Sequence, residues 1–210
     1  MLLTAAASAL WGQTADRADP SPPKSDGVAV KALRLFEPFE PKPFTAKERL
    51  HLYIVSTVGP LPILTQAASA GIFQALNRPP EWGQGAKAYG KRMADGFAYN
   101  AVRTTITYGT SALFDEDDRY FASGRENAGG RILFALSSPF RARTGSGKYR
   151  FSISTTSGIV GGAVISRTWE PESWQGAGNI GRSIAYGYAG IAGLNLFREF
   201  VPDIIRRIKK

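Results

Sequence analysis

Cysteine is absent from this sequence of 210 residues. Its absence excludes disulfide frameworks, thiolate zinc sites and cysteine nucleophiles, so packing has to stabilise the fold. Histidine is nearly absent: His51 is the single one, and a lone histidine at the start of an apolar helix is more often a core-edge residue than a base. Neither a GxSxG nucleophile motif nor a GxxxxGK[ST] phosphate loop occurs. We therefore infer no catalytic activity, no catalytic residue and no cofactor.

Charge is missing from a long internal segment, which runs from Leu52 to Asn77 without one Asp, Glu, Lys or Arg. Its length suits a bilayer span, but Pro60 and Pro62 interrupt it and several hydroxyl and amide side chains make it only moderately apolar. Three interpretations follow. The segment is a transmembrane span, an interfacial or re-entrant segment, or a buried helix broken at Gly59 and Pro60.

The N-terminal region divides into two predicted parts. Residues 1–15 are apolar and alanine-rich, and they resemble the end of a signal peptide that lacks its basic start. They predict export to the periplasm or outer membrane, with inner-membrane association as the alternative location and a short first helix as the alternative structure. Residues 16–44 are proline-rich and predict an extended arm or linker. Thr45 and Glu48 form a capping-box pattern, so we expect order to begin there, in a helical domain of residues 45–210.

Small residues recur every fourth position in two glycine-rich segments, 151–169 and 179–200. Such rows let two helices approach more closely than the usual ~8–10 Å between axes. The glycines predicted to make these contacts are Gly158, Gly162, Gly181, Gly187 and Gly193. Oligomerisation through the same helices is a further prediction.

The fold class follows from these patterns together with a proline-free segment, 86–114, that predicts one long helix. We predict an all-α fold, a bundle of about five helices in which the glycine-rich helices pack closely. The alternative is an outer-membrane β-barrel, because the stretches YRFSISTT and SIAYGYAG alternate in places. Only two or three such stretches occur, whereas a barrel needs about eight.

Acidic residues are concentrated in the run from Asp115 to Asp118. The run lacks the alternating spacing and central glycine of a calcium loop, so a solvated junction between helix and loop is favoured. As weak metal candidates we retain Asp115, Asp117 and Asp118.

Basic residues exceed acidic ones, and the formal net charge is +9. Four of them cluster at the C-terminus beside apolar isoleucines, and they would be attracted to an anionic membrane surface. These candidates are Arg206, Arg207, Lys209 and Lys210. A solvated tail is the alternative, and no signature of a nucleic-acid-binding fold is recognised.

Four blocks resemble a family of uncharacterised secreted bacterial proteins. They are EWGQGAKAYGKR (81–92), DEDDRYF (115–121), RARTGSG (141–147) and REFVPDI (198–204). The family has a DPRYF-like core where this chain has Asp118 before Arg119, which puts the local turn geometry in doubt. The resemblance would span Thr45 to Ile204; it implies export and a helical domain, and it transfers no site.

Together these features predict a structural or membrane-associated component of the bacterial cell envelope. The alternative is a small enzyme or ligand carrier with a cavity between its helices.

Overall fold

The structure is a computed structural model that describes residues 27–42 and 44–210. The predicted signal peptide, residues 1–15, and the first part of the arm lie outside the described residues. The α-helices are α1 (Val28–Arg34), α2 (Ala46–Val58), α3 (Pro60–Ala75), α4 (Ala86–Leu113), α5 (Ala128–Ser137), α6 (Ile153–Ile165) and α7 (Ala177–Ile208). The predicted all-α helical bundle is confirmed.

A small antiparallel sheet and four single turns of 3-10 helix complete the described structure. The strands β1 (Glu116–Asp117), β2 (Arg141–Thr144) and β3 (Tyr149–Phe151) pair in the order β1-β2-β3. Glu116 lies opposite Thr144, and Arg141 lies opposite Phe151. The 3-10 turns are η1 (Pro80–Trp82), η2 (Ser138–Phe140), η3 (Ser166–Thr168) and η4 (Glu172–Trp174).

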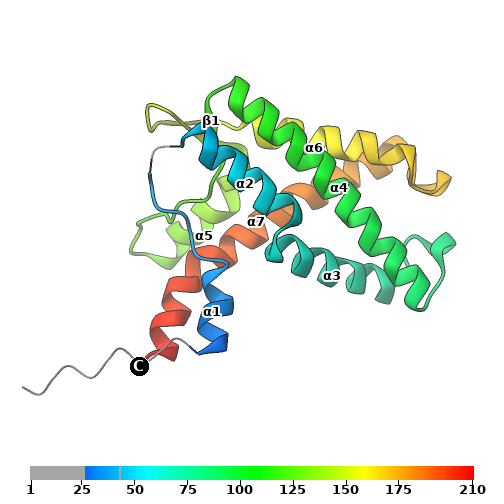
Figure 1. Cartoon of the computed structure of the whole chain (residues 1–210), viewed down its shortest axis with the longest axis horizontal. Helices are drawn as coiled ribbons and strands as arrows, with labels where there is room; N and C mark the ends of the chain where they lie inside the picture. The colour runs from blue at the N-terminus through cyan, green and yellow to red at the C-terminus, as the bar shows by residue number, and fades with distance from the viewer. Residues whose placement is uncertain (1–26, 43) are drawn as a thin grey trace, which may run out of the picture.

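The long helix α4 organises the fold. It packs against α2 and α3 on one side and against α6 on another, while α7 packs against α1, α5 and α6. Figure 1 shows α4 (green) crossing the molecule beside α6 (yellow), and α1 (blue) beside the C-terminal end of α7 (red).

The break between α2 and α3 lies where the sequence predicts it. Thr45 and Glu48 form the complete capping box at the start of α2, with the Thr45 amide donating to Glu48 Oε2 at 2.9 Å. Gly59 takes an extended ψ of 179°, which is the conformation favoured before a proline, and Pro60 begins α3. The interpretation as a buried helix is wrong, because no residue of Ala46–Val58 is buried and only Pro62 and Ala70 are buried in α3.

The predicted extended arm contains a helix, and order begins before Thr45. Residues Val28–Arg34 form α1 because tertiary burial outweighs the neighbouring prolines: Val30 is 3% exposed and packs in a cluster with Val201 and Ile205 of α7. Helix α7 itself continues through Pro202 to Ile208.

The predicted glycine contacts divide into two groups. A Cβ atom at Gly158 would lie 2.8 Å from the Arg103 carbonyl oxygen and against Thr107, and one at Gly162 would lie 3.1 Å from the Tyr99 ring. Gly187 of α7 approaches Ile159 of α6 in the same way, at 2.9 Å. These three glycines therefore lie at close helix contacts, although the row on α6 meets α4 rather than α7.

The prediction is wrong for Gly181 and Gly193. A Cβ atom at either position would meet no atom of a neighbouring described element within 4 Å. A four-residue period defines a row of small residues, but it does not say which end of the row has a neighbour.

Candidate functional surface

Apart from His51, the exposed side chains of α2 and α3 from Leu50 onward are apolar. Exposed aliphatic side chains recur at spacings of three and four residues, and their exposed fractions run from 38% at Val55 to 64% at Val58. The set, named the α2–α3 surface from here on, is Leu50, Ile54, Val55, Val58, Ile63, Leu64, Ile72 and Leu76. An ordinary surface helix would present charged or polar groups at these positions.

The side of α2 that faces α4 is polar. Thr57 Oγ1 lies 2.9 Å from Thr104 Oγ1, and Tyr53 Oη lies 2.9 Å from Thr105 Oγ1, so hydroxyl pairs join α2 to α4. The Asn100 amide nitrogen donates to the Ser56 carbonyl oxygen at 3.0 Å. Along α4 the buried side chains include Asn100, Thr104, Thr107 and Ser111. The polarity of this part of the bundle is therefore inverted.

Helix α6 has a related arrangement. Its buried side consists mostly of small residues, including Ser154, Gly158 and Gly162, whereas Val160 and Val164 are 38% and 49% exposed. Small and hydroxyl-bearing residues at contacts, with branched aliphatic residues outside, are typical of helices that pack in lipid.

None of the helices in the described part of the chain has both the length and the apolar character needed to cross a bilayer. The two helices that carry the α2–α3 surface have 13 and 16 residues.

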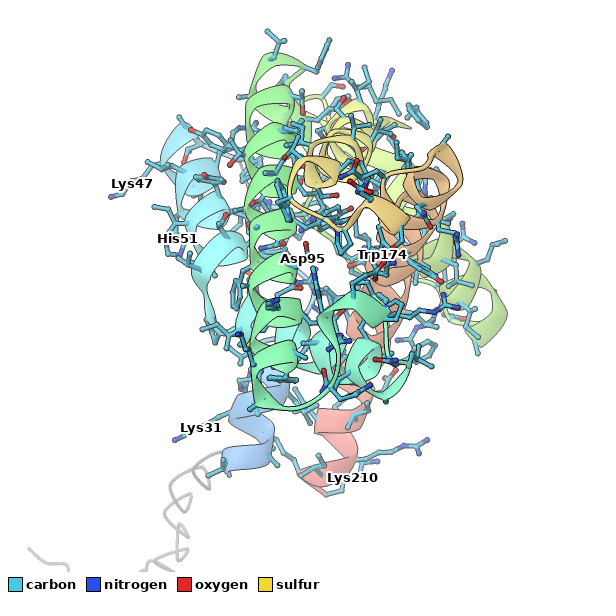
Figure 2. All side chains as sticks on the ribbon, turned by 90° about the vertical axis from the view of Figure 1, so that its right-hand side faces the viewer. Lys31, Lys47, His51, Asp95, Trp174 and Lys210 are labelled. Atoms are coloured by element: carbon cyan, nitrogen blue, oxygen red, sulfur yellow. The ribbon has the colours of Figure 1, made fainter. Side chains whose placement is uncertain are left out.

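The predicted membrane-surface cations Arg206, Arg207, Lys209 and Lys210 are all exposed at the C-terminal end of α7. Figure 2 shows Lys210 at the same end of the molecule as Lys31, while Lys47 and His51 lie on α2 toward the opposite end. The C-terminal cations therefore do not border the start of the α2–α3 surface; Lys47 and His51 do.

The acidic run does not form a metal site. In residues 27–42 and 44–210, no group of three or more His, Asp or Glu side chains is placed to hold a metal ion. Asp115 lies in the turn before β1 with a positive φ of 50°, and the side chains of neighbours such as Asp117 and Asp118 point to opposite sides of an extended segment, so the candidates separate. Asp115 is exposed, Asp117 forms an ion pair of 2.7 Å with Arg119, and Asp118 is exposed at the rim of a cavity between the helices.

Glu116 shows why the predicted solvated junction is wrong in part. It is fully buried and caps the first turn of α6, accepting hydrogen bonds from the amides of Ile153 at 3.2 Å and Ser154 at 2.8 Å. Arg150 pairs with it at 3.2 Å. A carboxylate at a helix N-terminus is stabilised by the free amide groups there, so this residue is structural.

Glu199 is a second buried carboxylate with a full set of partners. Its oxygens accept hydrogen bonds from Tyr120 Oη at 2.6 Å, from Ser123 and from Arg131. Burial alone raises its pKa, but the hydrogen bonds from Ser123, Tyr120 and Arg131 outweigh it and hold the pKa of Glu199 below its usual value. It joins α7 to the loop before α5 and to α5 itself, and leaves no free acid for chemistry.

Sequence reasoning missed the inverted polarity. The signal was available, because Ile54 and Val58 repeat at four residues on one side of α2 while Tyr53 and Thr57 repeat on the other. Which side of α2 faces α4 depends on the tertiary fold, and the sequence of one helix does not determine it.

Comparison of the chain with protein-family models, with curated proteins and with solved structures gives no match.

Proposed function

We propose that the protein associates with a lipid bilayer through the α2–α3 surface, with both helices lying in the interfacial region. The observation that supports this most directly is the inverted polarity: hydroxyl and amide groups join α2 to α4, and aliphatic side chains face outward. In a bilayer the outward aliphatic side chains contact lipid, and the hydroxyl and amide groups stay hydrogen-bonded inside the protein, so both sides of α2 are in favourable surroundings.

The energetic gain is large enough to matter. Burying the exposed half of one aliphatic side chain contributes ~1 kcal/mol, so the eight side chains of the α2–α3 surface contribute on the order of 8 kcal/mol before the cost of immobilisation. In water the same surface would be an unusually large exposed apolar patch.

Lipid accounts for the distribution of exposed apolar residues better than a protein partner does. Leu133 of α5, Phe151 of β3, Val164 of α6 and Tyr186 of α7 are also exposed, by 49% to 66%. A protein partner covers one contiguous patch, whereas lipid solvates several faces at once. The formal net charge of +9 adds attraction to anionic headgroups.

A structural role in the bacterial cell envelope, in the periplasm or outer membrane, is the biological setting that we propose for this association. It rests on the predicted signal peptide and on the family resemblance, and both stay predictions.

Vesicle flotation tests the proposal. The full chain is mixed with phosphatidylcholine vesicles, which carry no net charge, and the floated fraction is compared with that of the double variant Ile63→Asp/Ile72→Asp. We expect the parent chain to float and the variant to lose at least tenfold in partition coefficient, since two charges would have to enter the apolar interface.

Val28→Asp is the matched control, because Val28 is 86% exposed on α1 and lies outside the α2–α3 surface. It should float like the parent chain. Equal flotation of all three proteins, or failure of the parent chain to float at all, would contradict the proposal.

A further inference from the structure

A cavity of about 210 Å³ lies between α2, α3, α4 and α7. Leu52, Leu61 and Leu194 form part of its apolar wall, and Asn100, Thr104 and Asn195 are among its polar lining residues. The sequence predicted a ligand cavity, if any, between the glycine-rich helices, which are α6 and α7. Helix α6 contributes only Thr155 to this cavity and α7 contributes one side of it, while most of the wall comes from α2, α3 and α4.

The charges in the wall are strongly unbalanced. Four arginines line the cavity, Arg49, Arg103, Arg119 and Arg198, against a single carboxylate, Asp118. Arg119 is already paired with Asp117 at 2.7 Å, and Arg49 donates to Ser111 Oγ at 2.9 Å and to the Glu116 carbonyl oxygen at 2.7 Å.

The other two arginines form no ion pair within 4 Å among the described residues, although the charge of Asp118 acts on Arg103 from across the cavity. Arg103 donates through Nη2 to Asn100 Oδ1 at 2.9 Å, and Arg198 donates through Nη1 to Asn195 Oδ1 at 3.3 Å. Arg198 Nε is buried and has no hydrogen-bond partner in the described structure. Burial lowers the pKa of both guanidinium groups, which marks the cost of keeping these charges away from water.

Two phenylalanines hold the cationic wall in place. The guanidinium carbons of Arg49 and Arg119 lie 4.4 Å and 4.2 Å from the centre of the Phe44 ring, and Arg198 lies 5.9 Å from the centre of Phe39. Guanidinium groups that stack on aromatic faces are restrained in orientation, so their donors are pre-organised. Both phenylalanines belong to the segment 16–44 that the sequence predicted as an extended arm.

We infer that this cavity binds an anionic group, a carboxylate or a phosphate, with Arg103 and Arg198 as its direct ligands. An oxyanion there supplies the missing partner of both guanidinium groups and the missing acceptor for Arg198 Nε. The volume is below the ~300–1,000 Å³ of pockets for drug-sized molecules, so the group is small or is the head of a larger amphiphile. The neighbouring leucines suit an apolar attachment to that group.

Calorimetry on the full chain in dodecyl maltoside micelles tests the inference. Inorganic phosphate is the probe for a free anion, and phosphatidylglycerol added to the micelles is the probe for a lipid headgroup. We expect saturable binding of one of the two, weakened at least tenfold in Arg103→Gln and in Arg198→Gln. Arg182→Gln, which removes an exposed arginine of α7, is the matched control and should bind like the parent chain.

Thermal unfolding separates ligand binding from a structural role. Without added anion, Arg103→Gln and Arg198→Gln should melt at or above the temperature of the parent chain, because each removes a partly desolvated charge that no ion pair neutralises. If both variants melt well below the parent chain, the arginines are structural and the inference is overturned.

The remaining outcomes are also decisive. Binding of phosphate identifies a free anion, and binding of phosphatidylglycerol alone identifies a headgroup. Binding of neither, or equal loss in Arg182→Gln, overturns the inference. Should a glutamine variant fail to fold, Arg198→Lys keeps the charge while removing the planar donor pair, and unchanged affinity in that variant overturns it too.

Discussion

Two regions of this molecule solve the problem of burial in opposite ways. Where α1 meets the end of α7, Val30, Val201 and Ile205 are buried, and exposed cations such as Arg207 and Lys210 lie outside. Between α2 and α4, Thr57, Asn100 and Thr104 form the contact, and Val58 and other aliphatic residues lie outside. The first region follows the pattern of a protein in water, and the second follows the pattern of one in lipid.

The close contact of α6 with α4 should be the most sensitive point of the inverted region. Gly158→Val places a branched side chain against the Arg103 carbonyl oxygen and Thr107, and we expect it to lower the free energy of unfolding by about 3 kcal/mol. Denaturant unfolding in micelles measures this. Gly193→Val is the matched control on α7, where the space is open, and a loss there as large as at Gly158 would refute the assigned contact.

The stability of the region where α1 meets α7 should depend on the volume of its buried apolar side chains. The stability of the region between α2 and α4 should not depend on the exposed aliphatic side chains. Val201→Ala leaves a cavity in a side chain that is 0% exposed, and we expect a loss of about 2 kcal/mol. Ile63→Ala, at a side chain 46% exposed, should change the stability in micelles by less than ~0.5 kcal/mol. If Val201→Ala and Ile63→Ala lower the stability equally in thermal unfolding, the two regions do not differ in this way.

The hydroxyl pairs between α2 and α4 should contribute less to stability than the buried side chain of Val201. Thr104→Val keeps the shape but removes a hydroxyl that lies 2.9 Å from Thr57 Oγ1, and we expect a loss of about 1 kcal/mol. Because the Thr57 hydroxyl also donates to the Tyr53 carbonyl oxygen at 2.7 Å, it is not left unpaired. Thr168→Val, at an exposed hydroxyl of η3, is the control. A gain in stability in Thr104→Val would show that the hydroxyl groups between α2 and α4 destabilise the fold.

Local features of the fold could be predicted because each depends on a few neighbouring residues. The cap at Thr45 and the break at Gly59 and Pro60 are set by side-chain and backbone chemistry within one turn. Helix α1 could not be predicted, since a seven-residue helix among prolines is stabilised by contacts of Val30 with residues at the other end of the chain.

The candidate sites show the same limit. The uncharged segment was visible in the sequence, and its exposure was not. The four arginines of the cavity come from α2, α4, α7 and the loop after β1, so no spacing in the sequence brings them together. The acidic run was conspicuous because it is contiguous, yet neighbours along an extended chain point apart, and its members have separate roles.

The pairing of α1 with the end of α7 also sets an order of events during synthesis. Val30 emerges from the ribosome well before Val201, so the apolar cluster between α1 and α7 cannot form until α7 has been synthesised. Throughout that interval α2 and α3 present their aliphatic residues with no such core beside them. Helix α1, although it is made before the other described helices, is therefore among the last to be stabilised.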